Sequence, residues 1–214
     1  MMLFHLVKKD FLIVKKYVLL MFVVCVIIPP FMVWRVPEYA GPMSFVLSAI
    51  FAIFMLLQYV SLKEYQYPKA STLLCAMPYP RKLLVLSKYV FCLVIYAVCC
   101  VIFWIETFIF AELGGFHFEM PILMFLMLAI FLGVYLPVQY KLGYEKTKFA
   151  FVVIIMTSPF VFPQLLKMED GVNLDFLNAL PPALLYGGII LIGLMILIAS
   201  AGVSVEFYKG TDLK

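Results

Sequence analysis

The chain alternates long apolar runs with short polar segments. A helix needs about 20 mainly apolar residues to cross the roughly 30 Å hydrocarbon core of a bilayer. Six runs come close to that length, and they cover residues 17–34, 43–62, 84–111, 121–140, 149–166 and 181–205. The pattern predicts an all-α integral membrane protein with six transmembrane helices.

Lysine and arginine crowd into every second connecting segment. The N-terminal segment, the second-to-third loop, the fourth-to-fifth loop and the tail carry Lys8, Lys9, Lys15, Lys16, Lys63, Lys69, Arg81, Lys82, Lys88, Lys141, Lys146, Lys148, Lys209 and Lys214. The other loops hold only Arg35 and Lys167. Short loops rich in Lys and Arg stay in the cytoplasm. We therefore expect both termini to face the cytoplasm.

Composition agrees with this topology. The 214 residues are 66% hydrophobic and 13% charged, whereas roughly 25% charged residues is usual for soluble domains. The net charge of +4 follows from the basic loops, so we expect no nucleic-acid partner. Six spans and their connections use the whole length, which predicts a single transmembrane domain over 1–214. The segment up to Lys16 is long and charged for the start of a cleavable signal peptide.

The cysteine and histidine residues are not spaced along the sequence in a way that predicts a metal site. The residues are Cys25, Cys75, Cys92, Cys99, Cys100, His5 and His117. None of them follows the ligand spacings of zinc sites. Buried cysteines in apolar helices mostly behave as small hydrophobic residues, so we expect no metal.

The first 16 residues have a pattern of their own. Phe4, Val7, Phe11 and Val14 recur at helical spacing, and the basic residues lie between them. This predicts an amphipathic helix over 1–16 that lies in the headgroup layer. The alternative is a plain cytoplasmic extension of the first span.

The loop over 63–83 is the most structured connection. Pro68 suits the first turn of a helix, and an apolar stripe formed by Leu73, Leu74 and Met77 follows. Pro78 and Pro80 end that helix, because proline cannot donate the backbone hydrogen bond. The pattern predicts a short helix between two spans, on the cytoplasmic face.

This loop and the tail resemble those of type-2 ABC transporter permeases. Residues 77–89 read MPYPRKLLVLSKY, similar to the family's pattern LP-hydrophobic-(S/T)-R-x-x-(I/L)-V-x-x-K-Y. Residues 204–213 read SVEFYKGTDL, similar to the ending S-x-x-x-(Y/F)-x-x-x-D-(L/F). Met77 replaces the usual Leu, and Pro80 replaces the usual hydroxyl residue.

The resemblance implies a permease that pairs with a second permease copy and with separate ATPase subunits. The loop would then be a coupling helix that docks on the ATPase. The residues implied are Glu64, Lys69, Leu73, Leu74, Met77, Arg81 and Lys82. The chain has no Gly-x-x-x-x-Gly-Lys-Ser/Thr motif, so ATP and Mg would be bound by the partner, and we expect neither enzyme activity nor a cofactor here. With six spans and short outer loops, the chain most resembles the permeases of bacterial exporters of phenol-soluble modulins. This resemblance implies export of amphipathic peptides across the bacterial cytoplasmic membrane.

A few polar or small residues inside the spans remain to be explained. Glu106 is the one acidic residue well inside a predicted span; it either lines a translocation path or lies in the headgroup belt. For Gln58 and Gln139 we expect hydrogen bonds between helices. We expect the small residues of the last span to pack within one subunit.

Other functions stay open. They are an ion exporter of the same family, with Glu106 in its path, and a vitamin-binding membrane subunit of an importer. An intramembrane protease is not supported, because no span contains a histidine.

Overall fold

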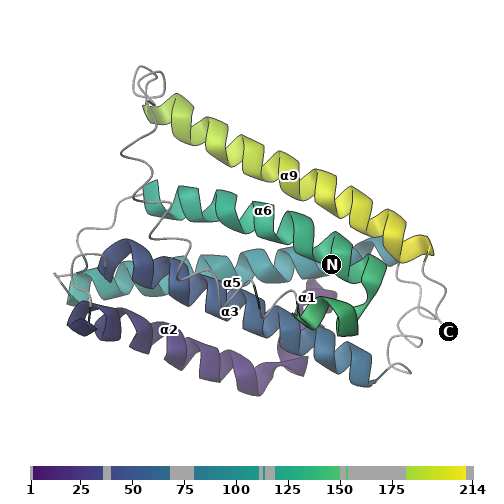
Figure 1. Cartoon of the computed structure of the whole chain (residues 1–214), viewed down its shortest axis with the longest axis horizontal. Helices are drawn as coiled ribbons and strands as arrows, with labels where there is room; N and C mark the ends of the chain where they lie inside the picture. The colour runs from purple at the N-terminus through teal and green to yellow at the C-terminus, as the bar shows by residue number, and fades with distance from the viewer. Residues whose placement is uncertain are drawn as a thin grey trace.

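Long helices make up almost all of the part that the computed structural model describes, which is residues 2–35, 40–67, 80–110, 113, 119–149, 153 and 182–210. Figure 1 shows these helices running along one common direction. Their bounds are α1 Met2–Ile13, α2 Lys15–Arg35, α3 Ala40–Gln66, α5 Arg81–Ile109, α6 Glu119–Leu142 and α9 Pro182–Gly210. The all-α prediction is confirmed.

Five of these helices, α2, α3, α5, α6 and α9, are long and apolar enough to cross a membrane. They correspond to five of the six predicted spans, with ends that differ by up to five residues. The largest difference is at α9, which was predicted to end at residue 205 and continues to Gly210. The remaining predicted span, 149–166, lies outside the described residues except for Phe149 and Val153.

The central helix of the bundle is α3. In its most apolar stretch 61% of α3 is buried, against 17% for α2 and 22% for α9. Helix α2 packs antiparallel on α3, with the rings of Tyr17 and Tyr59 stacked at 3.7 Å. Helix α5 also runs antiparallel to α3, while α6 and α9 pack on each other in parallel. The exposed apolar faces of α2 and α9 are therefore suited to contact lipid.

Two helix ends show how the local sequence sets the bounds. Pro80 is extended (φ −62°, ψ 132°) and precedes the first turn of α5, where proline is tolerated because it lacks only a donor that has no partner there. At the other end of a span, Gly143 has φ +80° and its N–H donates to the Gln139 carbonyl at 2.9 Å. This left-handed glycine cap ends α6, and the chain becomes helical again over 144–149.

Small residues allow α6 and α9 to approach closely. A Cβ on Gly193 would lie 2.8 Å from the ring of Phe125, and one on Gly133 would lie 3.0 Å from Ile196. Ser200 also donates to the Gly133 carbonyl at 3.0 Å. Packing within one subunit is thus confirmed for this part of the last span. At Gly187, Gly188 and Gly202, no atom of another described element lies within 4 Å of a Cβ built there.

The N-terminal helix forms over 2–13, and most of the predicted apolar face is packed. Val7 and Val14 are buried and Phe11 packs against the core, whereas Phe4 is 73% exposed. Contacts with α5 decide the orientation of α1, because Asp10 pairs with Lys88 and Phe11 packs on Phe91. The position of α1 in the headgroup layer stays a prediction.

Candidate functional site

A cluster of two lysines and two carboxylates joins three helices at the end of the bundle where α3 finishes and α5 begins. We call this end, which also holds α1 and the last turns of α6 and α9, the basic end. Lys88 of α5 lies 2.7 Å from Glu64 Oε1 and 3.2 Å from Asp10 Oδ1. Lys9 lies 3.1 Å from the same Asp10 oxygen and 3.5 Å from the same Glu64 oxygen. The cluster therefore ties α1, α3 and α5 together.

Burial increases toward the centre of this ion-pair cluster. The Asp10 side chain is fully buried and the Lys88 side chain is 7% exposed, against 26% for Lys9 and 36% for Glu64. Two positive and two negative charges balance, which is how charged groups are tolerated in a buried place. Asp10 Oδ2 has no hydrogen-bond partner among the described residues. Removal of either lysine would leave two carboxylates with one cation between them.

The sequence reasoning did not predict this cluster. It assigned Lys9 to a basic face and counted Lys88 with the loop charges, although Lys88 lies inside the predicted third span. The signal was present in the sequence, because Asp10 is the only acidic residue before Glu38. A single carboxylate in a basic segment and a lysine within an apolar run are candidates for mutual pairing.

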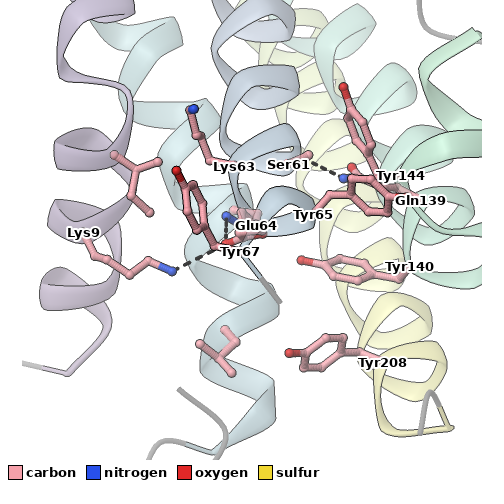
Figure 2. Close-up of a pocket in the computed structure, with 13 residues that line it drawn as sticks. Lys9, Ser61, Lys63, Glu64, Tyr65, Tyr67, Gln139, Tyr140, Tyr144 and Tyr208 are labelled. Atoms are coloured by element: carbon pink, nitrogen blue, oxygen red, sulfur yellow. Dashed lines mark hydrogen bonds and ion pairs between the residues drawn. The ribbon is translucent and has the colours of Figure 1, made fainter. Parts of the chain in front are cut away.

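A cavity of about 550 Å³ lies beside the cluster. Its lining comes from α1, α3, α5, α6 and α9 and from residues just beyond α3 and α6. Five of the lining side chains are tyrosines, namely Tyr65, Tyr67, Tyr140, Tyr144 and Tyr208. Figure 2 shows the hydroxyls of Tyr140 and Tyr208 directed toward the side of the cavity where Glu64 lies. The volume is in the range of small-molecule sites.

Hydrogen bonds between α3 and α6 form one wall of this region. Gln139 donates to Ser61 Oγ at 2.6 Å, and Tyr135 donates to Gln58 Oε1 at 3.0 Å. The Gln58 amide in turn donates to Tyr144 at 3.2 Å. The predicted interhelical role of both glutamines is confirmed.

The residues predicted to couple to an ATPase fall into two groups. Glu64 lies in the last turns of α3 and Arg81 and Lys82 in the first turn of α5, so the predicted loop 63–83 is shorter than expected, with helix up to Gln66 and again from Arg81. Glu64 contacts Lys9 and Lys88, while Arg81 and Lys82 are exposed. The other predicted residues, Lys69, Leu73, Leu74 and Met77, lie outside the described residues, and so does the predicted coupling helix.

Glu106 lies at the opposite end of α5, in the interior. It is 4% exposed and shares the buried face of Cys99 and Phe103, whereas the neighbouring Trp104 is 48% exposed. Glu106 Oε1 has no hydrogen-bond partner within the described part of the chain. Glu106 therefore faces the interior of the helix bundle, and its place in a translocation path or in the headgroup belt stays a prediction.

Metal-binding side chains do not gather anywhere in the described ranges. No group of three or more His, Cys, Asp or Glu residues there could hold a metal ion. Cys25, Cys92, Cys99 and Cys100 are free thiols, and Cys75 lies outside the described residues.

Residues 5–209 match the family described as ABC-2 family transporter protein. No curated protein and no solved structure shows significant similarity to the chain. The match covers nearly the whole chain, including α1, all five candidate spans and the 67–80 connection. The membrane subunits of this family are non-catalytic, carry no cofactor and work with an ATPase subunit. The chain therefore belongs to the ABC-2 transporter family, as a multi-pass membrane permease.

Proposed function

We propose that this permease is the membrane subunit of an ATP-driven exporter of amphipathic, membrane-dissolved substrates, above all peptides. It would act as a dimer of permease chains, each bound to an ATPase subunit, in the bacterial cytoplasmic membrane with both termini in the cytoplasm. Membership in the ABC-2 family disfavours the alternative of a vitamin-binding importer subunit.

The observation that supports this proposal best is the position of the ion-pair cluster. The connection between α3 and α5, predicted to dock on the ATPase, is flanked by Gln66 and Arg81. Glu64 lies two residues before the end of α3, and Lys88 lies two turns into α5. Because Lys88 binds both Glu64 and Asp10 of α1, a displacement of the connection would move three helices together. Rigid helices with discrete contacts are suited to carry such coupling.

The substrate class follows from the resemblance and from the cavity. A cavity with mostly apolar walls, tyrosine hydroxyls and charged groups fits a ligand that has both an apolar and a polar face. The excess of lysine and arginine in alternate connecting segments supports an orientation with the basic end in the cytoplasm. An amphipathic peptide in the inner leaflet could then reach the cavity from the side.

Docking is tested by co-purification with the ATPase subunit. The variants Leu74→Glu and Met77→Glu should reduce the amount of ATPase recovered, because a charge would enter the predicted apolar stripe. Lys148→Glu, at the same end but outside the stripe, is the matched control. Unchanged recovery for both stripe variants would contradict docking through this segment.

Coupling is tested in liposomes that contain permease and ATPase, by measuring ATP turnover while amphipathic peptides are added. Peptides should stimulate turnover in the wild type, and Glu64→Gln should reduce the stimulation at least about fivefold without loss of ATPase binding. Glu145→Gln removes a carboxylate at the same end that accepts a hydrogen bond from Tyr65 and lies outside the ion-pair cluster, and it should change little. Stimulation that is equal in all three proteins would exclude coupling through the cluster.

Glu106 supports a second candidate, an ion exporter of the same family. A buried carboxylate, one oxygen of which has no partner among the described residues, is a typical cation ligand or relay group within a span. Stimulation of ATP turnover by small cations and not by peptides would favour this function, and loss of that stimulation in Glu106→Gln would place the ion there.

A further inference from the structure

The helices of the bundle fall into two groups that meet beside the cavity. Helices α1, α2, α3 and α5 pack on one another, whereas α6 packs mainly on α9. Figure 1 shows α6 and α9 side by side, and the close approaches at Gly133 and Gly193 hold this pair together. The groups meet where residues 58–65 of α3 contact residues 135–145, at the end of α6 and just after it. We call this boundary the α3–α6 seam.

Hydrogen bonds between polar side chains close the α3–α6 seam. Along α3 these side chains follow one another at three or four residues, so they share one face of the helix. From the middle of the bundle toward its basic end, the pairs are Tyr135 with Gln58 at 3.0 Å, Gln139 with Ser61 at 2.6 Å, and Glu145 with Tyr65 at 2.8 Å. Figure 2 shows the second pair joining the two helices. Such hydrogen bonds between membrane helices contribute little stability each, because separated side chains find other partners.

The other boundaries of the cavity are held more firmly. Lys88 ties α5 to Glu64 of α3 and to Asp10 of α1, and breaking a buried ion pair leaves a charge without compensation. Between α5 and α9, the Tyr89 hydroxyl contacts two serines in a buried place. The seam hydrogen bonds are instead only partly buried, and the one from Tyr65 is exposed. Of these boundaries, the α3–α6 seam therefore separates most readily.

Two features confine such a separation to the basic end. One turn before Gln58, the buried ring of Phe54 packs edge-on against Phe131 of α6, with ring centroids 5.9 Å apart. This apolar contact is suited to act as a pivot. Beyond the seam, Gly143 has φ +80°, and no atom of the described residues lies within 4 Å of a Cβ built there. Because Ser61 and Gln139 line the cavity, their separation would widen the cavity sideways.

We propose that the α3–α6 seam is the gate through which a membrane-dissolved substrate enters the cavity from the side. The seam separates at the basic end, while the contact of Phe54 with Phe131 stays closed. Its side chains then exchange their mutual hydrogen bonds for bonds to the polar face of an amphipathic substrate, and the buried ion pairs remain intact. This inference rests on the proposed transport function, and it adds the wall that opens.

Opening is tested without any substrate, by pulsed electron paramagnetic resonance on the permease–ATPase complex in lipid nanodiscs. The five native cysteines are replaced by alanine, and spin labels are attached to Gln66→Cys on α3 and Leu142→Cys on α6, both at exposed positions. Across the ATPase cycle we expect a second distance that is longer by at least about 5 Å. Gln66→Cys with Lys82→Cys, on α3 and α5, is the matched control and should keep one distance. The single variants give the signal between two permease copies. Equal behaviour of both pairs would overturn the gate.

The role in substrate entry is tested by locking the seam. A short reducible thiol cross-linker between Ser61→Cys and Gln139→Cys should lower peptide-stimulated ATP turnover in liposomes at least about fivefold, and a reductant should restore it. The same treatment of Tyr17→Cys with Tyr59→Cys, whose rings stack between α2 and α3, is the control and should change turnover less than about twofold.

The two tests separate the gate from the transport function. Full stimulation in the locked protein would overturn the gate and leave peptide export standing. If peptides stimulate turnover in no variant, the proposed substrate is contradicted, and the distance between the spin labels alone decides whether the seam opens.

Discussion

Lys88 and Glu106 are two buried charged residues on one face of the same helix, and their surroundings differ completely. They lie eighteen residues apart on α5, which is roughly 27 Å along a helix axis. Lys88 is 5% exposed and contacts two carboxylates. Glu106 is 4% exposed, and its Oε1 has no partner in the described ranges. Burial is nearly equal, but among the described residues only Lys88 has ion-pair partners.

The difference shows that other helices decide what a buried charge does. At the basic end α1 and α3 supply Asp10 and Glu64, so Lys88 joins three elements and stabilises their arrangement. At the opposite end, within the described residues, no such partner reaches Glu106 Oε1. A buried charge that stabilises nothing locally is a candidate for function, whereas a compensated one is a candidate for structure and coupling.

The largest effect should come from the compensated charge. Lys88→Met should lower the free energy of unfolding by about 3–5 kcal/mol, because it leaves the buried Asp10 and the partly exposed Glu64 with only the half-buried Lys9 as cation. Denaturant titration in detergent measures this. Lys82→Met, at an exposed position on the same helix, is the control and should change stability little. The additional changes Asp10→Asn and Glu64→Gln should restore most of the loss; no restoration would mean that the lysine acts through packing alone.

A smaller effect should come from the polar contacts next to Lys88. The Tyr89 hydroxyl lies 2.7 Å from Ser200 and 2.9 Å from Ser204 of α9, and it joins α5 to α9. Tyr89→Phe should lower the free energy of unfolding by about 1 kcal/mol, since the ring stays and two buried serines lose a partner. Tyr67→Phe, at an exposed ring, provides the comparison. Equal stability of both variants would show that the serine contacts contribute nothing.

The smallest effect on stability should come from Glu106. Glu106→Gln keeps the shape and removes a charge that has little local compensation, so the free energy of unfolding should change by less than about 1 kcal/mol. Transport-linked ATP turnover should nevertheless fall if the carboxylate serves the pathway, as we propose for the ion-export alternative. If ATP turnover and stability are both normal in this variant, Glu106 is needed neither for transport nor for the stability of the bundle.

Local pattern was sufficient to predict the helices. Apolar runs of span length and Pro80 before α5 act through the hydrocarbon thickness and backbone geometry, which are properties of neighbouring residues. The same logic predicted a helix at the N-terminus and most of its packed face, since Val7, Phe11 and Val14 lie against the bundle. Phe4 fits the apolar period and is exposed, because packing on α5 set the orientation of α1.

The sequence by itself therefore determined the class of this protein: an all-α membrane protein with lysine and arginine concentrated in every second connecting segment. Only the tertiary structure decided which charges meet. Asp10, Glu64 and Lys88 are up to 78 residues apart, and a Coulomb interaction depends on distance in space, which spacing along the chain does not give. For the same reason the cavity beside them, with lining from α1, α3, α5, α6 and α9, could be found only from the assembled bundle.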